Sequence, residues 1–125
     1  MKILVCDRIH KTGEKILEAF TEVDVKPGLS PDELVSVIGD YDAVIVRSQT
    51  KITAEIIEAG AKLKVIGRAG VGIDNIDVDA ATRQGIVVVN SPEGNIVSTA
   101  EHTIALMLAL ARGVPQAHRQ LHDGV

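Results

Sequence analysis

The sequence predicts an α/β domain built around a parallel sheet, and three observations support this prediction. Short apolar segments rich in Val and Ile alternate with segments whose apolar residues recur at helical spacing. The chain has 125 residues, enough for one domain with a sizeable core. Hydrophobic residues make up 46% of the sequence and aromatic residues only 2%, so Val, Ile, Leu and Ala must form the core. Such a composition is typical of parallel strands covered by helices.

The first part of the chain contains two expected strands and two expected helices. The apolar run 2–6 predicts a buried strand. Residues 12–20 have helical spacing, with a threonine, Thr12, as the expected N-cap. Residues 22–26 alternate Val with charges, which indicates a short edge strand. Residues 30–38 begin with Ser, Pro and two acidic residues, and this combination predicts a helix start.

Three further strands and two further helices are expected in the middle of the chain. Residues 42–46 form the third expected strand, and the helix 53–59 follows with its first threonine as N-cap. Residues 63–66 form the fourth strand. A short helix over 77–84 ends at a glycine, and 86–89 is the fifth strand.

This alternation predicts how the elements are connected. Strand–helix–strand repetition implies right-handed crossovers and helices on both faces of the sheet. We therefore expect a flavodoxin-like, doubly wound sheet of five parallel strands. In such sheets ligands bind beyond the carboxyl ends of the strands, where Arg47, Arg68 and Asn90 fall.

The last segment has a different character. Ser98 and Glu101 have the spacing of a capping box, and residues 104–111 are apolar on every face of the expected helix. A helix of this kind must be buried on all sides, so we expect a second domain or a second subunit to cover it. Gly113 and Pro115 should break or kink the helix.

Composition excludes several classes of protein. The net charge is −4 and no basic run occurs, so nucleic acid and anionic membranes are not expected partners. The apolar stretch 104–111 is too short to span a bilayer. The single cysteine, Cys6, cannot form an internal disulfide and is expected in the core. No secretory signal precedes the first strand, and we expect a cytoplasmic protein.

The most informative stretch is residues 63–77, where three glycines surround Arg68 after an apolar strand. Glycines allow backbone N–H groups to approach a ligand, and an arginine adds donors for a carboxylate or a phosphate. The loop does not satisfy the dinucleotide-binding fingerprint. Asn75 stands where the third glycine belongs, and neutral Asn90 stands where the ribose-binding acid belongs. The loop therefore predicts a site for a small anion.

Three stretches, 46–48, 65–77 and 89–95, together with the helix 98–112, resemble the D-2-hydroxyacid dehydrogenase family. The resemblance covers the whole chain. It implies NAD-dependent oxidation of a 2-hydroxy acid in the parent enzyme. The best match within the family is to members that oxidise 3-phosphoglycerate in serine biosynthesis. Members that reduce glyoxylate or hydroxypyruvate share much of the pattern and remain an alternative.

The resemblance also implies that the chain consists of two functional parts. Residues 1–95 correspond to the substrate-binding domain, and 96–125 to an interdomain helix that starts the nucleotide-binding domain. The dinucleotide-binding strand and the catalytic Arg, Glu and His of the family are expected after Val125. We therefore expect a fragment that neither turns over nor binds NAD or a metal by itself, and that forms a homodimer through the helix 98–112. None of the following occupies the position of the catalytic histidine: His10, His102, His118 and His122.

The resemblance assigns roles to individual residues. The backbone amides expected to hold the substrate carboxylate belong to Ala69, Gly70, Val71 and Gly72. Val71 would also lie near the nicotinamide. Arg47 and Arg68 would face the phosphate, where charge-assisted bonds favour arginine, and Ser48 follows Arg47. Asn95 would orient the substrate or the neighbouring domain.

Each assignment has a plainer alternative. Arg47 and Arg68 could instead be solvated residues beside a strand end and a turn. Ser48 could cap the backbone, and Asn95 could be the N-cap or a turn residue of the following helix. A response-regulator-like module with the same fold is the alternative from another class. It would need an aspartate where Arg47 stands, and Asp7 alone favours it.

Overall fold

The structure is a computed structural model that describes residues 1–124. The chain divides into two compact units, Met1–Gly94 and a second unit that begins at Asn95. Each unit is described by itself. Within the described residues, no helix combines the length and the apolar character needed to cross a membrane.

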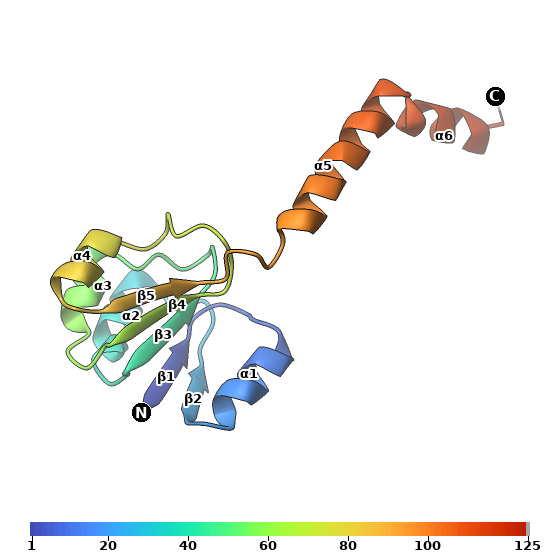
Figure 1. Ribbon diagram of the computed structural model, residues 1–125. Coiled ribbons are helices and arrows are strands. Elements are labelled where there is room, and N and C mark those ends of the chain that lie inside the picture. The colour runs from blue at the N-terminus through green and yellow to red at the C-terminus, as the bar shows by residue number, and fades with distance from the viewer. Residues whose placement is uncertain (125) are drawn as a thin grey trace. The chain divides into compact units, whose positions relative to one another are not determined.

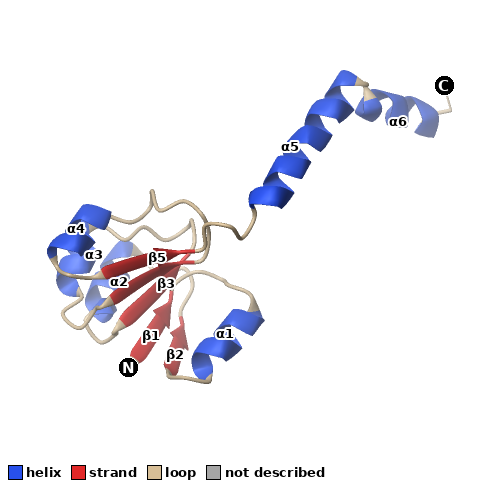
Figure 2. Cartoon of the chain, in the orientation of Figure 1, coloured by secondary structure: helices blue, strands red, loops and turns tan. Residues whose placement is uncertain are grey.

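The first unit is built on five parallel strands, which are drawn as red arrows in Figure 2. Their order is β2-β1-β3-β4-β5, which confirms the flavodoxin-like prediction and places β2 at an edge. The strands are β1 (Lys2–Val5), β2 (Glu22–Val25), β3 (Ala43–Val46), β4 (Val65–Arg68) and β5 (Val87–Asn90).

Four helices connect these strands, as Figure 1 shows. They are α1 (Lys11–Glu18), α2 (Pro31–Ile38), α3 (Ala54–Ala59) and α4 (Val78–Arg83). The expected capping box of α2 is confirmed: the N–H of Glu33 donates to Ser30 Oγ, and the Glu33 carboxylate accepts the N–H of Ser30. Gly85 follows α4 with a φ of 71°, so the expected glycine stop is also confirmed.

Two details at helix starts differ from the prediction. Thr12 is not the N-cap of α1, because the helix begins at Lys11 and His10 is the N-cap. The Nδ1 atom of His10 accepts the N–H of Thr12 at 3.2 Å. The helix is therefore capped by an imidazole and not by the hydroxyl that we expected. Thr53 is at the N-cap of α3 as expected, but its side chain makes no capping hydrogen bond.

The fourth and fifth strands lie further along the chain than predicted. The apolar pattern placed the fourth strand at 63–66, but β4 extends to Arg68. Gly67 and Arg68 pair with Ile45 and Val46 on one side, and the same two residues pair with Val89 and Asn90 on the other. Strand pairing on both sides extends β4 past the last apolar residue. Arg68 is therefore held by the sheet and does not belong to a free loop.

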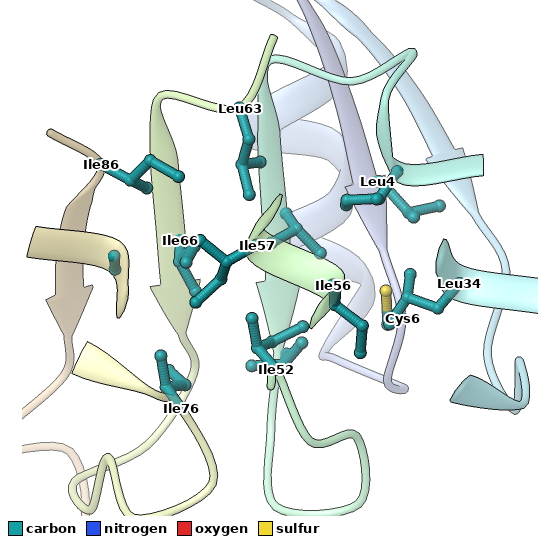
Figure 3. Packing of buried hydrophobic residues seen from close by; sticks show 14 of the residues in the cluster. Leu4, Cys6, Leu34, Ile52, Ile56, Ile57, Leu63, Ile66, Ile76 and Ile86 are labelled. Carbon is teal, nitrogen blue, oxygen red and sulfur yellow. The ribbon is translucent and has the colours of Figure 1, made fainter. Parts of the chain in front are cut away.

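The main core lies between the sheet and helices α2, α3 and α4. Figure 3 shows Ile56 and Ile57 of α3 among strand residues that include Leu4 and Ile66, all of them almost fully buried. The other face of the sheet has a smaller cluster, with Ile3, Val5 and Ala43 packed near α1. Helices therefore lie on both faces, as expected, with α2, α3 and α4 on one face and α1 on the other.

The smaller face stays open over the last strands of the first unit. Val87 and Val89 of β5 are 56% and 49% exposed, although both are apolar strand residues. Beside them lies a groove of about 360 Å³. Its apolar lining comes from Ile9, Ile16, Leu17, Ile45 and Val89.

The second unit contains two helices, α5 (Ile96–Ala111) and α6 (Val114–His122). The expected break is confirmed: Gly113 has a left-handed φ of 60° and separates the helices. The expected capping box of Ser98 is wrong, because the N-cap of α5 is Asn95, three residues earlier. Ser98 Oγ instead donates to the carbonyl of Asn95, one turn back.

The apolar segment of α5 is exposed within its own unit. Its large side chains are between 57% and 75% accessible, and they are Ile104, Leu106, Met107, Leu108 and Leu110. The prediction that a second domain or subunit covers this helix stays a prediction.

Candidate functional site

The candidate site lies at the carboxyl edge of the sheet, where the strand ends meet. Arg47 directly follows β3, and Arg68 and Asn90 are the last residues of β4 and β5. Arg68 and Asn90 are paired in the strand register. These three positions confirm the expectation that their residues fall at the carboxyl edge of the sheet, the edge at which ligands bind in sheets of this kind.

The glycine loop after β4 is tied to the end of β5 by its carbonyl groups. The carbonyl of Gly70 accepts the backbone N–H of Ser91 at 3.0 Å. The carbonyl of Val71 accepts the side-chain amide Nδ2 of Asn90 at 2.7 Å. Asn90, which the sequence already placed at this edge, therefore contacts the glycine loop through its side chain, and this contact was not predicted.

The four amides predicted to hold a carboxylate are not equivalent. The N–H of Ala69 donates to the carbonyl of Val46 at 2.8 Å, and that of Gly70 donates to the carbonyl of Arg68 at 2.9 Å. Within residues 1–124, the N–H groups of Val71 and Gly72 donate to no other group of the protein. Both residues are exposed, so these two adjacent amides are the ones free to bind an anion.

The glycines of the loop make room for neighbouring side chains. A Cβ added to Gly70 would overlap the guanidinium of Arg68, which lies against that position. A Cβ on Gly72 would lie 2.8 Å from Oδ1 of Asp74. The guanidinium of Arg68 thus lies against Gly70, the residue that precedes the two free amides, and its Nε atom is buried with no hydrogen-bond partner in the described chain.

The loop that carries Arg47 is fixed by a buried aspartate. Asp7, only 2% exposed, follows β1 and accepts the backbone N–H groups of Arg47 and Thr50. Its other oxygen accepts the hydroxyl of Thr50 at 2.7 Å. Asp7 therefore holds the Arg47 loop in place by accepting these three hydrogen bonds.

A second clamp joins the Arg47 loop to the glycine loop. The Nδ2 atom of Asn75 donates to the carbonyls of Arg47 and Thr50 at 2.7 and 2.6 Å. Asn75 lies where the dinucleotide fingerprint would require a glycine, and its side chain has a structural role there. The two loops that carry the predicted anion-binding groups are thus joined by this side chain, in addition to the backbone bonds between Ile52 and residues 75 and 77.

Arg47 and Ser48 are both exposed, and they border a small polar pocket of about 290 Å³. Arg8 and Gln49 line the same pocket, and Arg47 Nη1 donates to the carbonyl of Arg8 at 3.5 Å. Arg8 is a second cation beside Arg47. Its position directly after Asp7 at the end of β1 was the signal that could have identified it from the sequence.

Three further residues considered in the sequence analysis have defined structural positions. Asn95 belongs to the second unit and is the N-cap of α5, although its side chain makes no capping bond. Asp77 caps α4 by accepting the N–H of Ala80 at 2.9 Å. Cys6 is fully buried in the core as expected, and burial with the nearby charge of Asp7 raises the pKa of its thiol to about 12.

The chain was then compared with known proteins. The family described as D-isomer specific 2-hydroxyacid dehydrogenase, catalytic domain, matches residues 3–124. A D-3-phosphoglycerate dehydrogenase of Synechocystis is 57% identical over 122 residues, which are 98% of this chain and 22% of the relative. The chain therefore spans about a fifth of that relative's length.

Two solved structures extend the comparison to the fold. The TT0316 protein of Thermus thermophilus superposes with a TM-score of 0.84 and 34% identity, over 99% of this chain and 41% of that one. The NAD⁺-bound 3-phosphoglycerate dehydrogenase of Entamoeba histolytica gives a TM-score of 0.75 and 38% identity, over 87% of this chain and 38% of that one. Sequence and fold agree, and the chain belongs to the D-isomer specific 2-hydroxyacid dehydrogenase family.

Proposed function

We propose that the first unit is the substrate-binding part of an NAD-dependent dehydrogenase that oxidises 3-phosphoglycerate at its 2-hydroxyl to 3-phosphohydroxypyruvate, in serine biosynthesis. The observation that carries the proposal is the pair of free amides of Val71 and Gly72, which directly follow Gly70, the residue against which the guanidinium of Arg68 lies. The similarity to the D-3-phosphoglycerate dehydrogenase of Synechocystis supports the choice of substrate.

The substrate has two anionic ends, and the site offers donors suited to each. Free backbone amides form a fixed array that needs no reorganisation to hold a carboxylate. The phosphate requires more charge, which Arg47 and Arg68 supply through charge-assisted bonds, with Ser48 beside them. Arg8 shares the pocket of Arg47 and adds a further positive charge there.

The described residues fit one contact with NAD and do not fit the whole dinucleotide. Val71 presents an apolar side chain that is 38% exposed, suitable for packing against a nicotinamide ring. The third glycine position of the dinucleotide fingerprint is Asn75, which leaves no glycine there to suit the pyrophosphate. The side-chain amide of Asn90 is bonded to the Val71 carbonyl and offers no acid for the ribose. We propose that a nucleotide-binding domain elsewhere in the parent protein supplies NAD binding and the catalytic groups.

This chain alone should therefore bind the acid weakly, without bound NAD, and should not oxidise it. The exposed apolar side chains of α5 support a homodimer formed through the helix 98–112. The buried, free thiol of Cys6 is compatible with a reducing cytoplasm, where we place the protein.

The structure disfavours the response-regulator alternative. The end of β3 carries Arg47, and Asp7 is buried with its oxygens occupied by the Arg47 loop. An aspartate in that situation has no free, accessible oxygen for a phosphoryl group.

The test is a binding assay with matched ligands. Ligand-observed NMR should detect 3-phosphoglycerate binding to the wild-type chain in the millimolar range, with no NADH formed when NAD is added. Arg47→Ala should weaken 3-phosphoglycerate about tenfold or more and leave unphosphorylated glycerate unchanged. Equal effects on both ligands would favour the glyoxylate or hydroxypyruvate alternative. No binding of 3-phosphoglycerate to the wild type would overturn the proposed function.

A further inference from the structure

The orientation of the two free amides depends on what holds the carbonyls next to them. A peptide unit is planar, and in the trans form its C=O and N–H groups point in opposite directions. No cis peptide bond occurs in the described chain. The unit that joins Gly70 to Val71 therefore directs the N–H of Val71 away from the Gly70 carbonyl. The next unit directs the N–H of Gly72 away from the Val71 carbonyl.

Both of these carbonyls are fixed by the end of β5. The Gly70 carbonyl accepts the backbone N–H of Ser91, and the Val71 carbonyl accepts Nδ2 of Asn90. Each bond pulls a carbonyl toward β5 and turns the N–H of the same peptide unit outward. Of the two bonds, only the one from Asn90 is made by a side chain.

The chemistry of position 90 fits this task. A carboxamide donates to a carbonyl, whereas a carboxylate has only acceptors and would repel the Val71 carbonyl. Asn90 is itself the last residue of β5, paired with Arg68 in register, so its backbone is fixed by the sheet. The Asn90 side chain thus connects the glycine loop to a residue of the sheet.

We propose that Asn90 is a positioning residue that orients the Gly72 amide, and through the shared Val71 residue the Val71 amide, for a substrate carboxylate. The proposal rests on the proposed function of the glycine loop. Asn90 touches neither substrate nor cofactor in this scheme. It acts through the peptide between Val71 and Gly72.

The test uses Asn90→Ala in the ¹⁵N-labelled full chain, with Gln84→Ala as the matched control. Gln84 is also an exposed carboxamide, located at the C-cap of α4. The ligands are 3-phosphoglycerate and glycerol 3-phosphate, which keeps the phosphate and lacks the carboxylate. Because both side chains are exposed, both variants should fold, and their Tm values report on this directly.

Asn90→Ala should weaken 3-phosphoglycerate about fivefold, as expected for one hydrogen bond, and leave glycerol 3-phosphate unchanged. The residual dipolar coupling of the Gly72 N–H should also change in Asn90→Ala. Gln84→Ala should alter neither the affinity for 3-phosphoglycerate nor this coupling. A residue that merely stabilised the fold would weaken both ligands equally, and that result would overturn the proposal.

The coupling separates this proposal from the proposed function. If the wild-type chain bound neither ligand, the proposed function would fail, and the Gly72 coupling would still decide the role of Asn90. A changed coupling in Asn90→Ala supports the positioning role. An unchanged coupling contradicts it, whatever the ligands do.

Discussion

Asp7 is the residue on which the Arg47 loop most depends. Asp7→Ala would leave the N–H groups of Arg47 and Thr50 and the hydroxyl of Thr50 without their acceptor in a buried setting. We expect a loss of about 2–4 kcal/mol in the free energy of unfolding. Urea denaturation measures this loss. Asp40→Ala is the control, since the Asp40 side chain is 81% exposed with a 3.9 Å contact to Lys62, and a change below about 1 kcal/mol is expected there.

Cys6 allows a second prediction for a single residue. Its thiol is fully buried, and its pKa is raised to about 12, so almost none is thiolate at pH 8. Ellman's reagent should therefore react with the folded chain only at the rate of unfolding, and at once in guanidinium. Rapid reaction of one thiol under native conditions would contradict the buried position of Cys6.

Single-residue predictions from the sequence succeeded where they depended on strand ends. Arg47, Arg68 and Asn90 could be placed at one edge because parallel strands bring their carboxyl ends together. The roles of Asp7 and Asn75 could not be predicted in this way. Their partners lie 25 to 43 residues away in sequence and become neighbours only through the loops of the folded sheet.

At the scale of elements, the capping box of α2 gives a prediction with a defined pH dependence. The N–H and the hydroxyl of Ser30 lower the pKa of Glu33 below its ordinary value of 4.5. A lowered folded-state pKa means that this stabilisation is present above the unfolded-state pKa and is lost as the pH falls through the folded-state value. The Tm difference between wild type and Glu33→Gln should be largest at neutral pH and should shrink below pH 4.5. A difference that grew in acid would contradict the carboxylate's role in the cap.

The hydroxyl in the same box can be tested separately. Ser30→Ala removes the acceptor for the N–H of Glu33 and should cost about 1 kcal/mol in the free energy of unfolding. Ser98→Ala should cost less than Ser30→Ala, because Ser98 lies inside α5 and caps no helix. Equal losses of unfolding free energy in the two variants would mean that the Ser30 hydroxyl does not stabilise α2 as a cap.

The type and order of the elements in the first unit were predicted correctly from the sequence, whereas their boundaries were predicted less accurately. Short apolar runs identified all five strands, but β4 and β5 continue past the apolar residues because strand pairing extends to Arg68 and Asn90. The box at Ser30 was predicted correctly and the one at Ser98 was not. The same spacing occurs one turn inside α5, where the preceding Asn95 already starts the helix.

At the scale of the whole molecule, the second unit determines the expected association. Leu106 and Leu110 are 57% and 75% exposed and lie one helical turn apart on α5. The double variant Leu106→Glu/Leu110→Glu should convert the proposed dimer into a monomer in sedimentation equilibrium. Gln116→Glu on α6 adds charge to a polar position and should leave the dimer intact. A wild-type chain that stayed monomeric across the micromolar range would contradict the proposed dimer.

We propose that the carboxyl edge of the sheet holds a phosphorylated 2-hydroxy acid between the free amides and the arginines. The most direct measurement is a ¹⁵N–¹H titration of the labelled chain with 3-phosphoglycerate. We expect the backbone signals of Val71 and Gly72 and the Nε–H signals of Arg47 and Arg68 to shift together at millimolar ligand. A spectrum in which these four groups do not respond, while other regions do or nothing does, would contradict this proposal.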